Sequence, residues 1–177
     1  MIEYRLADWM AKLGTEGAFV VLARAKELEA QGREIVHLQI GEPDFDTPKN
    51  IVEKAKWALD HGYHHYTPSQ GMMEFREVIC DYLAKTRAPA KWDPSEIVVG
   101  PGGKPIIVAA IMALLNPGDE VILPNPTYPA YVSFIKFIGA KPVYVPISEE
   151  KGFRFNVEDV RRKVTDRTRM IFLNSPA

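Results

Sequence analysis

The chain has 177 residues, and 22 lysines and arginines stand against 23 aspartates and glutamates, which leaves a net charge of -1. Hydrophobic residues make up 46% of the sequence, so an intrinsically disordered chain is excluded, and no basic excess exists to bind nucleic acid. A chain of this length can bury a core without crosslinks. Its single cysteine, Cys80, excludes a disulfide framework and a thiolate metal site.

The N-terminal segment, MIEYRLADWM, carries acidic residues and lacks the apolar core of a signal peptide. The longest apolar run, near Ile106 to Leu115, is too short to cross a bilayer. We therefore expect a cytoplasmic protein that has no membrane partner.

Predicted helices and strands alternate along the chain. The predicted helices are residues 19–31, 48–61, 72–86, a segment from the glycines near 103 to about 115, 130–137 and 157–164. The predicted strands are residues 97–99, 121–123, 142–145 and 170–173, and residues 35–40 form a short extended piece. Thr47 and Asn156 are predicted N-caps, and Gly32 and Gly62 are predicted helix stops.

Short apolar strands between helices predict an α/β fold, with a parallel-type sheet flanked by helices. In such sheets, ligands bind beyond the carboxyl ends of the strands. Three predicted loops meet that condition: Gly100–Lys104, Pro124–Tyr128 and Asn174–Pro176.

The first loop, Gly100-Pro101-Gly102-Gly103-Lys104, lies between a predicted strand and a predicted helix. Its glycines let the backbone approach a ligand, and the N–H groups that begin a helix attract anions, so the loop suits a phosphate. It is not the nucleotide P-loop, because Pro105 replaces the Ser or Thr that would hold magnesium. An ordinary strand-to-helix turn is the alternative.

The second loop holds Tyr128 between Pro126 and Pro129, at an angle from which its ring can stack on a flat cofactor. A core tyrosine on a rigid turn is the alternative. The segment Tyr66–Gly71 offers hydroxyls before a helix, which favours either a second phosphate contact or a simple cap. The histidines of the HGYHHY segment lack ligands at metal spacing, so no metal site is expected.

Six segments in this order resemble the class I/II aminotransferases, the fold-type I pyridoxal phosphate (PLP) enzymes similar to aspartate aminotransferase. The resemblance runs from about residue 15 to the last residue and covers the N-terminal portion of the family pattern only. The six segments are residues 40–48, Tyr66-Thr67 with Gly71 and Phe75-Arg76, residues 102–104, residues 117–121, residues 126–129 and residues 174–176.

The resemblance implies roles for individual residues. The backbone of Gly102, Gly103 and Lys104 matches the cup for the cofactor phosphate, and Tyr128 matches the ring that stacks on the cofactor. Gly41 matches the position whose backbone meets the substrate carboxylate. Tyr66 matches the tyrosine that reaches the phosphate in the neighbouring subunit, which implies a homodimer.

The resemblance also implies what the 177 residues do not contain. The family's Schiff-base lysine, the aspartate that pairs with the cofactor nitrogen, and the arginine that grips the substrate carboxylate all match positions beyond Ala177. No catalytic residue is therefore expected in this chain. Residues 1–47 are expected to form an N-terminal arm and the start of the small-domain region, and residues 48–177 the first part of the large PLP-binding domain.

The expected function is transfer of an amino group from an amino acid to a 2-oxo acid, by an enzyme of which this chain is an N-terminal fragment that is inactive alone. A PLP-dependent lyase or synthase is one alternative, and an inactive truncated product is another. An aminotransferase-like ligand domain of a bacterial regulator fits poorly, because only about fifteen residues precede the matching region.

Overall fold

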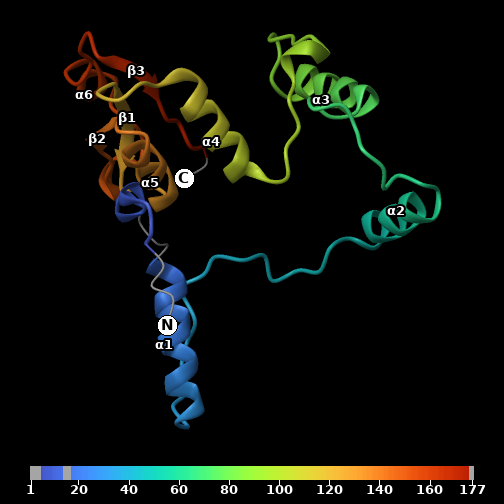
Figure 1. Cartoon of the computed structure of the whole chain (residues 1–177), viewed down its shortest axis with the longest axis horizontal. Helices are drawn as coiled ribbons and strands as arrows, with labels where there is room; N and C mark the ends of the chain where they lie inside the picture. The colour runs from blue at the N-terminus through green and yellow to red at the C-terminus, as the bar shows by residue number, and fades with distance from the viewer. Residues whose placement is uncertain (1–4, 14–16, 176–177) are drawn as a thin grey trace. The chain divides into compact units, whose positions relative to one another are not determined.

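The computed structural model describes residues 5–13 and 17–175 (Figure 1). Two compact units make up the chain: residues 1–40 together with residues 107–177, and Gly41–Ile106. No helix among the described residues is long and apolar enough to cross a membrane.

The first unit is built around a parallel sheet of three strands in the order β2-β1-β3. The strands are β1 (Glu120–Asn125), β2 (Lys141–Pro146) and β3 (Thr168–Ile171). The helical elements are η1 (Asp8–Lys12), α1 (Gly17–Ala30), α5 (Pro129–Phe137), η3 (Glu149–Lys151), α6 (Val157–Arg161) and α4 (Gly103–Leu114), whose first turn belongs to the second unit. This sheet confirms the predicted α/β fold class.

The central strand β1 explains why the sheet is parallel and buried. Val121, Ile122 and Leu123 are fully buried, and successive side chains of a strand point to opposite faces, so both faces of β1 are covered. Val121 and Leu123 belong to one core cluster with Ile111 of α4 and Ile135 of α5. Trp9 of η1 packs edge-on against Phe137, with ring centroids 5.0 Å apart.

The second unit contains α2 (Lys49–Asp60), α3 (Met73–Thr86), η2 (Pro94–Glu96) and the first turn of α4. Two residues of α3, Arg76 and Cys80, are buried, and α3 packs against η2. The helices α1 and α2 end at Ala30 and Asp60, two residues before the predicted stops Gly32 and Gly62, and both glycines adopt a positive φ that other residues rarely take.

The structure differs from the prediction at several points, among them the strand predicted at residues 170–173, which is Thr168–Ile171. Residues 97–99 form no strand: the segment is extended, but Val99 N–H donates to Gln70 O of a loop (3.0 Å), and no neighbouring strand is present among the described residues. The N-cap of α2 is Pro48 and not Thr47, because the Pro48 carbonyl accepts the first helical bonds.

The helix that follows Asn156 ends at Arg161 and not at Val164. Beyond it, Lys163 and Val164 N–H donate to carbonyls three residues earlier, so the chain tightens into turns. The cap itself is confirmed, because the Asn156 side chain accepts a hydrogen bond from Glu158 N–H at 2.9 Å.

Candidate functional site

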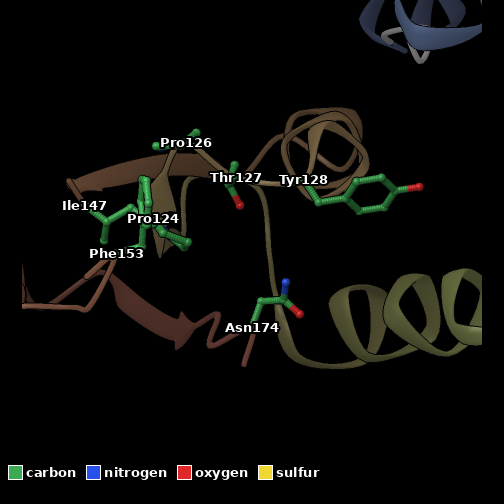
Figure 2. A pocket seen from close by; sticks show the side chains of 7 residues that line it. All are labelled: Pro124, Pro126, Thr127, Tyr128, Ile147, Phe153 and Asn174. Atoms are coloured by element: carbon green, nitrogen blue, oxygen red, sulfur yellow. The ribbon is translucent and has the colours of Figure 1, made fainter. Parts of the chain in front are cut away.

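A pocket of about 340 Å³ lies where the three parallel strands end (Figure 2). Its walls come from the end of β1 and the loop after it, from the residue that follows β2, from the turn after η3 and from the segment that follows β3. The lining residues are Pro124, Pro126, Thr127, Tyr128, Ile147, Phe153 and Asn174. Carboxyl ends of parallel strands are where α/β folds bind ligands, so the pocket lies at the predicted edge of the sheet.

Tyr128 stands at the rim of this pocket. It is the N-cap of α5, and its ring meets Tyr131 edge-on at 5.3 Å, while Tyr131 stacks on Phe172 at 4.8 Å. The Tyr128 side chain is still 37% exposed. A ring that is braced by other rings yet partly exposed can stack on a flat aromatic ligand without further ordering.

Thr127 gives the pocket an unsatisfied polar atom. Its Oγ1 is buried and has no hydrogen-bond partner among the described residues. Figure 2 shows this oxygen and the Asn174 amide pointing toward the same space. An unpaired buried hydroxyl is unfavourable, so the site fits a ligand that carries a polar substituent. Sequence reasoning singled out the two loops but assigned no role to either side chain.

The glycine-rich segment lies in the second unit and leads into α4, which begins at Gly103. Gly102 has a φ of +93°, and its N–H donates to Gly100 O at 2.8 Å, so this N–H closes the turn. Chain neighbours and the backbone of α4 aside, no atom of the described residues lies within 4 Å of where a Cβ would stand at Gly102 or Gly103. The start of α4 therefore has open space where an anion can approach the first helical N–H groups.

Two further predicted residues lie in the same unit, outside its regular elements. Tyr66 is fully exposed and precedes the loop that ends at Gly71. Apart from its chain neighbours, no residue within 5–13 and 17–175 has an atom within 4 Å of where a Cβ would stand at Gly41, so the Gly41 backbone can be approached closely.

The histidines of the HGYHHY segment follow α2. The His61 ring stacks on Trp57 at 4.3 Å, and its Nδ1 lies 2.7 Å from Trp57 O. The rings of His64 and His65 are 4.6 Å apart. Within residues 5–13 and 17–175, no cluster of three histidine, cysteine, aspartate or glutamate side chains has the arrangement of a metal site.

The family of this chain follows from its similarity to known proteins. The model of the family "aminotransferase class I and II" matches residues 33–177, which is most of the chain. The chain belongs to the class I and II aminotransferases. The predicted resemblance is therefore confirmed.

Relatives within this aminotransferase family are similar over nearly the whole chain. The probable aspartate/prephenate aminotransferase of Aquifex aeolicus is 44% identical over 171 residues, which cover 97% of this chain and 43% of the relative. The (5-formylfuran-3-yl)methyl phosphate transaminase of Methanocaldococcus jannaschii is 40% identical over 157 residues, which cover 89% of this chain and 40% of the relative.

A solved structure of aspartate aminotransferase from Thermus thermophilus with maleate has a TM-score of 0.90 and 35% identity, covering 99% of this chain and 46% of that one. This similarity confirms the fold-type I architecture. The chain spans less than half the length of the relatives it matches.

Proposed function

We propose that the protein carrying this chain is a PLP-dependent aminotransferase that moves an amino group from an amino acid to a 2-oxo acid. The observation that carries the proposal is the position of Tyr128, at the rim of a pocket beyond the strand ends, in a chain of this family. The named relatives are aminotransferases or transaminases, which favours amino transfer over a lyase or synthase reaction.

The residues present fit pyridoxal 5'-phosphate. The Tyr128 ring offers a face for a flat heterocycle, and the buried Thr127 Oγ1 needs a polar partner that the described residues do not supply. The cofactor supplies an electron-withdrawing ring that accepts the electrons left when the amino acid loses its α-proton.

This chain's own residues would bind and orient the ligands. We assign the backbone of Gly102, Gly103 and Lys104 to the cofactor phosphate, because α4 begins there with open space around the glycines. Tyr128 would fix the plane of the ring, and the apolar Pro124, Ile147 and Phe153 would exclude water from one side of it. Gly41 would meet the substrate carboxylate through its backbone.

The assembly proposed is a homodimer in the cytoplasm, in which Tyr66 contributes to the neighbouring subunit's phosphate site. The full exposure of Tyr66 supports a contact outside its own chain. We further propose that residues 1–47 form an N-terminal arm with the start of the small-domain region, and that residues 48–177 form the first part of the PLP-binding domain.

The proton transfer itself is assigned to no residue of this chain. The family's lysine matches a position beyond Ala177, so we propose that residues 1–177 alone bind the cofactor but do not transaminate. Incubation of the purified chain with PLP, glutamate and a 2-oxo acid should give no new amino acid. Turnover at a normal enzymatic rate would contradict the assignment of that lysine to a position beyond Ala177.

The cofactor proposal is tested by substitution of Tyr128. PLP binding to the purified chain, followed by absorbance and by quenching of intrinsic fluorescence, should be about tenfold weaker in Tyr128→Leu, because the stacking surface is lost. Tyr128→Phe should bind like the wild type. Tyr144→Leu, on β2 and comparably exposed, is the matched control. Equal affinity in wild type and Tyr128→Leu would remove the basis of the proposal.

A further inference from the structure

Arg76 is a buried cation that the proposed function does not use. It lies on α3 with a relative exposure of 5%. Its Nη1 donates hydrogen bonds to Pro94 O at 2.8 Å and to Gln70 Oε1 at 3.1 Å, and its buried Nε has no partner among the described residues. Neither bond is made to a carboxylate.

Burying a guanidinium against neutral acceptors is costly, and an apolar side chain of similar size would fill the same space more cheaply. Asp93 offsets part of that cost: its pKa is lowered mainly by hydrogen bonds from Ser95 and to a smaller degree by the charge of Arg76. Because burial of the Arg76 guanidinium still costs free energy, we infer that its role is to hold Gln70 and Pro94 in a fixed relative position through its two hydrogen bonds.

These two bonds join segments that lead to the two proposed phosphate contacts. Gln70 lies in the loop between Tyr66 and Gly71, and Pro94 is the first residue of η2, from which the chain runs to the glycine-rich segment. The joined segments and Arg76 all belong to the unit Gly41–Ile106.

Two further contacts fasten the same segments. Val99 N–H donates to Gln70 O at 3.0 Å. The Gly71 backbone lies so close to Val99 that a Cβ built on Gly71 would be 2.8 Å from Val99 Cβ. Gly71 also has a φ of +96°. The loop after Tyr66 is therefore held against the residue that precedes Gly100 by side-chain bonds, a backbone bond and a close backbone approach.

We propose that Arg76, acting through Gln70, is a positioning residue of the phosphate site: it fixes the Tyr66 loop relative to the glycine-rich segment. The inference rests on the proposed function, since it concerns the two segments assigned there to cofactor phosphates: the glycine-rich segment to the chain's own cofactor, and Tyr66 to that of the neighbouring subunit. Its consequence is selective, because the two hydrogen bonds of Arg76 end on Gln70 and Pro94, in segments that lead to the proposed phosphate contacts, and on no residue assigned to the cofactor ring. Loss of the Arg76 hydrogen bonds should therefore weaken the binding of ligands that carry a phosphate monoester and leave the binding of phosphate-free analogues unchanged.

The test compares the affinity of the purified chain for PLP and for pyridoxal, which lacks the phosphate. Arg76→Met keeps most of the side-chain length and removes the donors. We expect PLP to bind roughly tenfold more weakly to it, with pyridoxal unchanged. Gln70→Ala removes one acceptor from an exposed residue and should shift the PLP-to-pyridoxal ratio in the same direction by a smaller factor.

Arg87→Met is the matched control, because Arg87 is an exposed arginine at the C-terminal end of the same helix. Its ratio of PLP affinity to pyridoxal affinity should equal that of the wild type. Far-UV circular dichroism identifies unfolding: if Arg76→Met loses its helices, Gln70→Ala decides the question. Two results would overturn this inference and leave the proposed function standing. One is an unchanged ratio of PLP affinity to pyridoxal affinity in the folded variants, and the other is an equal loss of affinity for both ligands in Gln70→Ala. A wild type that does not prefer PLP over pyridoxal would overturn the phosphate assignment of the proposed function and the inference with it.

Discussion

Thr165 Oγ1 donates a 2.7 Å hydrogen bond to Glu120 Oε2 across 45 residues of sequence. Glu120 opens the central strand and is only 2% exposed. Its Oε1 accepts from Lys141 Nζ at 3.1 Å and from Arg167 Nη2 at 3.1 Å. One buried carboxylate therefore joins the starts of β1 and β2 to the segment that leads into β3, at the edge of the sheet opposite the pocket.

These contacts predict a pH-dependent stability. The hydrogen bond from Thr165, followed by that from Lys141, lowers the pKa of Glu120 below its ordinary value of 4.5. Because the folded pKa is the lower one, the stabilisation is complete above the unfolded pKa and is lost as pH falls through the folded pKa. Glu120→Gln should lower the melting temperature by several degrees at pH 7, and the difference should disappear in acid. Glu150→Gln, at an exposed position, should behave as wild type, and an acid-independent difference would refute this explanation.

Thr127→Val should stabilise the ligand-free chain. The hydroxyl is buried without a partner, so replacing it by a methyl group removes a desolvation cost of about 1 kcal/mol. Thr165→Val provides the opposite case, because its hydroxyl is paired with Glu120, and should destabilise. Urea unfolding of the two variants measures both effects. Destabilisation by Thr127→Val would mean that this oxygen already has a partner in the folded chain.

Gly71→Ala should be more harmful than Gly32→Ala. Both glycines have a positive φ, but the added Cβ would lie 2.8 Å from Val99 Cβ at Gly71 and in open space at Gly32. The strained backbone alone costs about 1 kcal/mol, and the clash adds about 2 kcal/mol. Free energies of unfolding from urea titration should separate the two variants by that margin. Similar losses would show that Val99 moves away without penalty.

Cys80 should react slowly in the folded chain. Burial and the neighbouring charges of Asp93, Asp81 and Glu96 raise the pKa of this thiol above its ordinary value, and the thiolate is the reactive form. A chromogenic disulfide reagent should modify the native chain roughly 100-fold more slowly than the urea-unfolded chain. The pH midpoint of the native reaction should also be the higher one. Because Cys80 is the only cysteine, the signal is unambiguous, and coincident midpoints would exclude the raised pKa.

Local patterns predicted most of the elements well. Proline and glycine punctuation placed the ends of α2, α3 and α5 within a residue or two, because backbone freedom and capping are decided by neighbouring residues. The apolar run Val121-Ile122-Leu123 identified the central strand, since a strand covered on both faces has no polar alternation. The same reasoning failed at residues 97–99, where an apolar extended segment lacks a strand beside it. Strand formation needs a partner, and no local pattern supplies one.

The sequence by itself predicted the family, through six segments that resemble the class I/II aminotransferases, and the parallel α/β architecture, through the periodicity of its helices and strands. Of the three loops predicted beyond strand ends, two follow strands of the sheet, whereas the glycine-rich loop follows the extended residues 97–99, which form no strand. Only the tertiary structure decided which side chains face the pocket and which are buried without partners. In the sequence, Thr127 and Arg76 lie in segments that resemble the family, but no role was assigned to either side chain. Arg76 is buried and donates to Pro94 O, 18 residues away in the sequence, and the buried Thr127 hydroxyl has no partner among the described residues. Both facts depend on how the chain packs in three dimensions.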